Sequence, residues 1–173
     1  DLKKEVIEHC NNISKKLNFN NLSFIYGDVI DYENKDEIDM VISLHACNTA
    51  TDIAILKALG WNAKVFFAVP CCQKEINSQL GNEFLPFMLK HCIIKEKFST
   101  LLTDSIRSEV LEAFGYKSDI VEFISEENTP KNQLIRAYKT STKLDKEKIK
   151  QIEKFTSSLN IKMFLLDEVA KLI

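Results

Sequence analysis

The sequence is poor in glycine and carries little net charge. Only four of its 173 residues are glycine, and none falls in a G-x-G-x-x-G or Walker arrangement, so no glycine-rich turn is present to cradle a phosphate or a cofactor tail. The formal net charge of −2 argues against a strongly basic nucleic-acid clamp, although it leaves room for a local basic face. No apolar run has transmembrane length, so we expect no membrane partner. The composition, 45% hydrophobic and 28% charged, predicts an ordinary globular protein with one substantial core.

Cysteine occurs in an odd number and in an unusual placement. There are five cysteines, Cys71 and Cys72 are adjacent, and no secretory signal is visible, which together favour a reducing, cytoplasmic setting and predict no disulfide. The chain begins at Asp1 rather than at a methionine and enters a helical pattern within a few residues. We therefore expect it to be a piece of something longer.

Two short apolar runs dominate the first half of the chain. Met40–Leu44 and Val65–Val69 are continuous rather than alternating, as is typical of strands buried on both faces of a parallel sheet. A helix is predicted between them, because Thr49 lies three residues before Asp52, close to capping-box spacing, and Gly60 can close the helix as its C′ residue. The three elements form a β-α-β unit.

Polar and thiol side chains follow each of these runs. Residues 45–49 (HACNT) follow the first run, and residues 70–73 (PCCQ) follow the second. Ligands of open α/β sheets bind beyond the carboxyl ends of the strands, and parallel neighbours bring those ends together, so the pattern predicts a site there. The alternative is simple packing, because a buried cysteine often behaves as a small hydrophobic residue.

The remaining chain predicts further helices and strands. In chain order they are an opening helix with Val6, Ile7, Cys10, Ile13 and Leu17 on one face, a strand at Leu22–Tyr26, a partly helical stretch from Glu75 to Phe98, a helix capped by Thr103 or Asp104 and ended by Gly115, a hairpin of Asp119–Ser125 and Gln133–Tyr138, and two closing helices, the second from Met163 to Ile173.

Four segments resemble one enzyme family. They are DLKKEVIEHC at 1–10, LHACNTATD at 44–52, VPCCQKEIN at 69–77 and GYKSDIVEFISEENTPKNQLIRA at 115–137. Together they are similar to a bacterial subgroup of class I S-adenosylmethionine-dependent methyltransferase domains, which is itself distantly similar to eukaryotic tRNA acceptor-stem 2′-O-methyltransferases. The resemblance covers nearly the whole chain.

The resemblance implies an α/β, Rossmann-like class I methyltransferase fold. The chain would be its C-terminal portion, without the first strand and most of the second, and with a mostly parallel sheet closed by an antiparallel β-hairpin. In the family order of third, second, first, fourth, fifth, seventh and sixth strand, Met40–Leu44 is the fourth. Residues 1–140 would form a partial methyltransferase domain, with residues 141–173 as a helical extension packed on it. The exposed sheet edge could pair with a second copy to give a homodimer.

The implied activity is S-adenosylmethionine-dependent methyl transfer to RNA or to a small molecule, with the fragment inactive alone. The implied cofactor-binding residues are Asp1 (ribose hydroxyls), Asp28 with Val29 (adenine), and Leu44, His45 and Cys47 (methionine portion). A carboxylate suits the first two places because it accepts hydrogen bonds from hydroxyl and amino groups. Asp28 could equally form only an Asx-type turn after Gly27.

In-line methyl transfer needs alignment and removal of the acceptor's proton. His45 is the candidate base, and Cys72, the second candidate catalytic residue, shapes the pocket together with Cys47. The candidate substrate-binding residues are Thr49, Thr51 and Asp52, which would orient cofactor or substrate, and Gln73, which would hold a polar group of the substrate. Two of these have structural alternatives, because His45 could be a satisfied strand-end histidine and Asp52 could only stabilise a helix N-terminus.

A second hypothesis is a non-catalytic or metal-binding α/β interaction module. His45, Cys47, Cys71 and Cys72 offer nitrogen and thiolate ligands of the kinds that zinc accepts. Adjacent cysteines fit the usual C-x(2 to 4)-C spacing poorly, so we expect no metal.

Overall fold

The computed structural model describes residues 1–34, 36–44, 46, 49–81, 85–125, 129 and 132–173. It divides into two compact units, Asp1–Asp36 and Glu37–Ile173. His45 and Cys47 lie outside the described residues. None of the described helices is both long and apolar enough to cross a membrane.

The first unit consists of helix α1, Lys4–Lys16, and the segment that folds back along it. The expected helix is confirmed, and Asn18 in a left-handed conformation (φ 58°) follows its end. The strand expected at Leu22–Tyr26 is wrong, because this segment is assigned to no strand. Part of its backbone hydrogen bonding is supplied by side chains of α1 instead: Asn11 bonds both the N–H and the carbonyl of Phe24.

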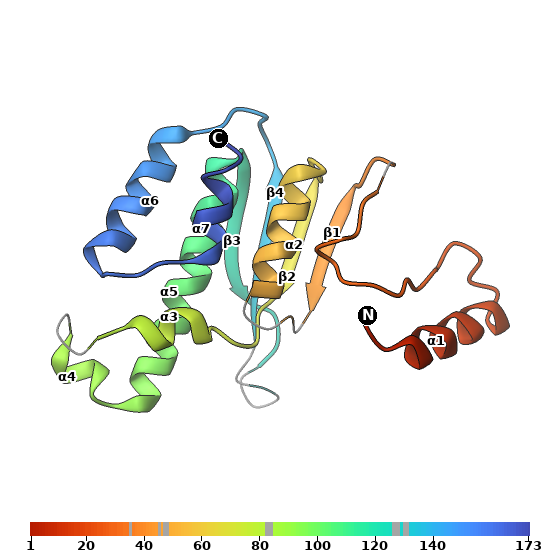
Figure 1. The fold of residues 1–173 in the computed structure, drawn as a ribbon, viewed down its shortest axis with the longest axis horizontal. Coiled ribbons are helices and arrows are strands. Elements are labelled where there is room, and N and C mark those ends of the chain that lie inside the picture. Colours follow the sequence, from red (N-terminus) through yellow and green to blue (C-terminus); the bar gives the residue numbers. More distant parts are fainter. Residues whose placement is uncertain (35, 45, 47–48, 82–84, 126–128, 130–131) are drawn as a thin grey trace. The chain divides into compact units, whose positions relative to one another are not determined.

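The second unit is built on a four-stranded sheet (Figure 1). Its strands are β1 (Met40–Leu44), β2 (Val65–Val69), β3 (Tyr116–Glu122) and β4 (Gln133–Lys139), in the spatial order β1-β2-β4-β3. This is the order fourth, fifth, seventh, sixth that the resemblance implied. The antiparallel hairpin of β3 and β4 is confirmed.

The expected mostly parallel sheet is wrong. Only β1 and β2 pair in parallel, while β4 is antiparallel to both β2 and β3. The physical reason lies in the hairpin, because its second strand inserts beside β2 and so reverses direction against both neighbours.

The helices pack on this sheet, with α2 and α5 in direct contact with its strands (Figure 1). The helices of the unit are α2 (Thr49–Gly60), α3 (Lys74–Gln79), α4 (Pro86–Leu89), α5 (Cys92–Ala113), α6 (Lys146–Ser158) and α7 (Phe164–Val169). One hydrophobic cluster joins the sheet to these helices, and it includes Ile55, Phe66, Leu111, Ile135 and Met163. The two closing helices therefore share the core of the sheet.

Several expected boundaries differ from the structure, among them those of the last helix, which is Phe164–Val169 rather than Met163–Ile173. Gly60 stays helical, and Asn62 (φ 53°) ends α2 in a Schellman motif, with Ala63 N–H bonding Ala58 O and Asn62 N–H bonding Leu59 O. Thr103 and Asp104 cap no helix, because α5 begins at Cys92 and buries both side chains. The third strand begins at Tyr116, three residues earlier than expected.

Candidate functional site

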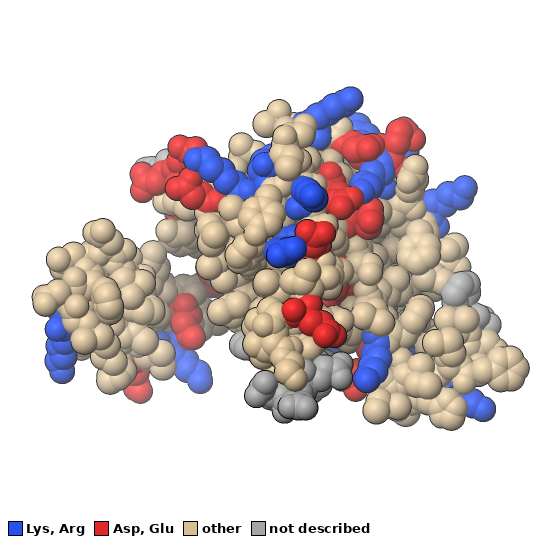
Figure 2. All heavy atoms as spheres, turned by 180° about the vertical axis from the view of Figure 1, so that it is seen from behind, with Lys and Arg blue, Asp and Glu red and all other residues tan. Residues whose placement is uncertain are grey.

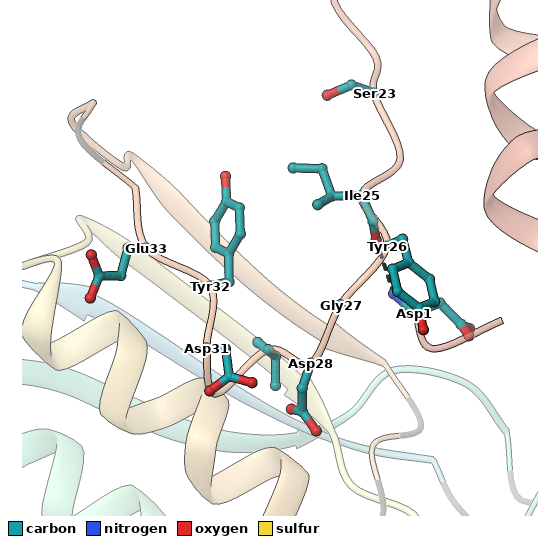
Figure 3. Close-up of a pocket in the computed structure, with 10 residues that line it drawn as sticks. Asp1, Ser23, Ile25, Tyr26, Gly27, Asp28, Asp31, Tyr32 and Glu33 are labelled. Atoms are coloured by element: carbon teal, nitrogen blue, oxygen red, sulfur yellow. Dashed lines mark hydrogen bonds between the residues drawn. The ribbon is translucent and has the colours of Figure 1, made fainter. Parts of the chain in front are cut away.

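A cavity of about 490 Å³ lies within the first unit (Figure 3). Its walls come from Asp1 and from the segment that follows α1. The lining residues are Asp1, Ser23, Ile25, Tyr26, Gly27, Asp28, Val29, Asp31, Tyr32 and Glu33. The structure thus brings together three of the expected cofactor-binding residues, although Asp1 is far in sequence from the adjacent Asp28 and Val29.

Hydrogen bonds to the backbone shape this cavity. The Ser14 hydroxyl donates to the carbonyls of Phe19 and Leu22, both at 2.9 Å, which folds the segment back onto α1. At the cavity itself, the Asp1 amino group donates to the Ile25 carbonyl at 3.2 Å, and Gly27 N–H donates to the Asp1 carbonyl at 3.1 Å. Asp1 therefore joins the backbone on both sides of Tyr26, in the bonding pattern of parallel strands.

Asp28 serves as a turn residue and also lies on the cavity wall. Its Oδ1 accepts a hydrogen bond from Ile30 N–H at 3.0 Å, which is an Asx turn. The carboxylate is nonetheless exposed on the wall of the cavity. The turn and a ligand contact are compatible, because a carboxylate has a second oxygen that can accept hydrogen bonds.

The lining of the cavity is acidic and aromatic. Its charged residues are Asp1, Asp28, Asp31 and Glu33, and no Lys or Arg is among the lining residues. Such walls favour a ligand with hydroxyl or amino donors and positive charge, and they disfavour phosphate groups. The rings of Tyr26 and Tyr32 add apolar surfaces for a planar group.

The other expected site residues belong to the second unit. Leu44 is exposed at the end of β1, and Thr49 is the half-buried first residue of α2. Thr51 is buried, and its hydroxyl donates to the Ala46 carbonyl at 2.9 Å. Cys72 is half-buried and lines a second cavity, of about 380 Å³, next to Gln73.

A buried ionic network joins α2 to α5. Arg107 donates from Nε to Asp52 Oδ1 at 2.7 Å and from a terminal nitrogen to Asp104 Oδ1 at 3.0 Å, and each of these residues is about 1% exposed. Burial raises the pKa of the Asp104 carboxyl, and the Arg107 guanidinium opposes that shift. Asp52 Oδ2 has no hydrogen-bond partner among the described residues. The sequence analysis did not predict that Arg107 pairs with Asp52.

The network continues to the second cavity through Gln73. Its amide nitrogen donates to Asp104 Oδ2 at 3.3 Å, and its amide oxygen accepts from the Thr100 hydroxyl at 3.1 Å. Both ends of the Gln73 amide are therefore held by α5. The signal that sequence reasoning missed was Asp104 and Arg107, two charged residues spaced i, i+3 among the apolar positions of a helix.

Metal ligands do not gather in the part of the chain that the structure describes. No group of three or more His, Cys, Asp and Glu residues there could hold a metal ion. His45 and Cys47, two of the four ligands considered for zinc, lie outside that part.

Comparison with known families gives one finding. Residues 1–79 match the model of a family described as a methyltransferase domain. The matched segment contains the acidic cavity, β1, α2, β2 and α3, and hence every expected site residue. No curated protein matches the chain. The family match supports a methyltransferase, and the four-stranded mixed α/β sheet is compatible with that fold.

Proposed function

We propose that the protein transfers a methyl group from S-adenosylmethionine to an acceptor, and that the acidic cavity of the first unit receives the adenosine end of this cofactor. The observation that carries the proposal is the convergence of Asp1, Asp28 and Val29 on one cavity inside the segment that matches a methyltransferase domain. When bound, S-adenosylmethionine supplies a methyl group activated by its sulfonium.

In this proposal the residues of the chain bind the cofactor, orient the acceptor and remove the acceptor's proton. Asp1 accepts hydrogen bonds from the ribose hydroxyls, and Asp28 accepts one from the adenine amino group. Leu44, His45 and Cys47 contact the methionine portion. His45 takes the acceptor's proton, and Cys72, the second expected catalytic residue, shapes the pocket.

Thr49, Thr51, Asp52 and Gln73 position the substrate. Three of them, Thr51, Asp52 and Gln73, are buried, and their side chains form hydrogen bonds within the protein. We therefore expect these three to act through the rigidity of the strand ends. The test is to measure kcat and KM separately for variants of these residues. Loss of a positioning residue should lower kcat more than it raises KM.

A small molecule is the favoured acceptor among the two expected classes. The net charge is −2, and Figure 2 shows acidic and basic side chains interspersed over the face it presents. RNA binding instead draws on clustered Lys and Arg that neutralise phosphates. Similarity to tRNA methyltransferases, a cytoplasmic location and a homodimer stay predictions, the last of which light scattering tests.

Calorimetric titration of S-adenosylmethionine tests the cofactor assignment. We expect Asp28→Ala to weaken binding about ten-fold or more, because it removes a charge-assisted hydrogen bond of roughly 1.5–3 kcal/mol. Asp36→Ala is the matched control, because Asp36 lies in the same unit outside the cavity. NAD, which carries phosphates, should bind more weakly than S-adenosylmethionine. An unchanged dissociation constant in Asp28→Ala, or tighter binding of NAD, would refute the assignment.

A further inference from the structure

Cys71 and Cys72 turn their sulfur atoms to the same side of the chain. Successive side chains of an extended chain point in opposite directions, which would separate two adjacent thiols. Here the two Sγ atoms lie 3.5 Å apart, directly after β2 and Pro70, where the strand ladder has ended. Both residues are half-buried and line the cavity of about 380 Å³.

The walls around the two thiols are held by hydrogen bonds. Gln73, the next residue, is fixed at both ends of its amide by Thr100 and Asp104. Across the cavity, Asn77 of α3 donates to the hydroxyl of the buried Ser99 of α5 at 3.0 Å. The residues that flank the two thiols are therefore fixed before a ligand binds, which reduces the entropy lost on binding.

The sulfur separation indicates which ligands fit. If each sulfur bonds one central atom at about 2.3 Å, as thiolates bond zinc, a separation of 3.5 Å corresponds to a bond angle of about 100° at that atom. This angle suits a pyramidal trivalent centre. A pair of thiols supplies two of the four ligands that zinc needs. It supplies all of the sulfur ligands of a thiophilic atom that needs only two.

We propose that Cys71 and Cys72 form a dithiol site for monosubstituted trivalent arsenicals, whose single organic substituent occupies the adjoining cavity. In the reaction R–As(OH)₂ gives R–As(S–Cys)₂: two As–O bonds break, two As–S bonds form, and each thiol proton leaves with a hydroxide as water. Arsenic stays trivalent, so no oxidant or reductant is consumed. The site does not rest on the proposed methyl transfer.

Phenylarsine oxide is the probe. We expect reduced protein to bind one equivalent, as followed by intact mass, and 2,3-dimercaptopropanol to remove it, whereas the same concentration of a monothiol should not. Cys71→Ser and Cys72→Ser should each weaken binding by about 100-fold or more, because each variant loses the second bond that the neighbouring thiol makes at high effective concentration. Cys10→Ser, in the first unit, is the control and should bind as the unsubstituted protein does.

Peptide mapping of the unsubstituted protein provides a second test that needs no variant. Bound phenylarsine oxide should protect Cys71 and Cys72 from alkylation and leave Cys10 and Cys92 reactive. Cys92, which also lines the cavity, distinguishes a two-thiol from a three-thiol site. The proposal is overturned if Cys92→Ser weakens binding as strongly as Cys72→Ser, if Cys71→Ser binds normally, or if the protected cysteines are others.

Discussion

The side chain of Asn11 makes both backbone hydrogen bonds of Phe24. Its Nδ2 donates to the Phe24 carbonyl at 2.8 Å, and its Oδ1 accepts from Phe24 N–H at 2.9 Å. These are the two bonds that a neighbouring strand would make, so one helical side chain replaces a local strand partner. The residues that follow Phe24 form the acidic cavity.

Replacing Asn11 should therefore loosen the cavity without touching it. We expect Asn11→Ala to lower the local opening free energy at Phe24 by roughly 1–2 kcal/mol, about ten-fold in amide hydrogen exchange, because two hydrogen bonds are lost. Asn12→Ala, at an exposed position of the same helix, should change little. Equal exchange rates in the two variants would contradict this role.

Arg107 should be necessary for the stability of the second unit. Arg107→Met leaves the buried carboxylates of Asp52 and Asp104 without their shared cation, so we expect the free energy of unfolding in urea to fall by about 3–5 kcal/mol. Lys150→Met removes an exposed ion pair with Glu147 and should change the free energy of unfolding far less, because solvent screens an exposed pair. Similar losses in both variants would show that the buried network stabilises the fold no more than an exposed ion pair does.

The buried Tyr116 should make the folded state less stable at alkaline pH. It is 3% exposed, its hydroxyl donates to Ala63 O at 2.6 Å, and burial raises its pKa to about 12. The folded state keeps this proton, whereas the unfolded chain releases it above a pKa of about 10. Its contribution is therefore complete below about pH 10 and disappears as the pH rises towards 12.

The matching variant is Tyr116→Phe. Lysines also titrate in this range, so the measurement is the difference in unfolding free energy between the unsubstituted protein and Tyr116→Phe. We expect this difference to fall by roughly 2 kcal/mol from neutral pH to pH 12. Parallel pH curves for the two proteins would contradict the raised pKa.

Gly115 and Gly60 should respond in opposite ways to alanine. Gly115 has φ 85°, and a Cβ there would lie 2.2 Å from the Ser141 carbonyl oxygen, so we expect Gly115→Ala to cost about 1–3 kcal/mol. Gly60 is helical with open space around it, so Gly60→Ala should stabilise by roughly 0.5–1 kcal/mol. Thermal melting of both variants tests the contrast, and destabilisation by Gly60→Ala would contradict it.

Elements with a local signal were predictable from the sequence. The bounds of β1 and β2 agree with the prediction at both ends, because each is a largely apolar run flanked by polar residues or proline. The burial expected on both faces is wrong for β1, because Met40, Ile42 and Leu44 are exposed. The start of α5 was missed, because Thr103 and Asp104 resemble caps. In the structure Thr103 bonds the Ser99 carbonyl within α5, and Asp104 accepts from Arg107 and Gln73. Leu22–Tyr26 has the composition of a strand but pairs with none, which composition cannot reveal.

The same division holds for the candidate site. Asp1 and Asp28 could be singled out because the sequence segments around them resemble the family. The structure places both residues on the wall of one cavity. The partnership of Asp52 with Arg107 joins residues of two different helices, and no spacing rule connects them. The short distance between the Cys71 and Cys72 sulfurs depends on the backbone conformation after Pro70, which the amino-acid sequence alone does not reveal.

The position of β4 in the sheet also constrains how the protein folds. β4 lies between β2 and β3, and Val65 pairs with Tyr138, so the outer edge of β2 gains its partner only after most of the chain has left the ribosome. Closing so long a loop is slow, because its entropy must be lost before the strand contacts compensate. Until then, Val65–Val69 presents an apolar edge, and the nascent chain is most prone to aggregate in that interval.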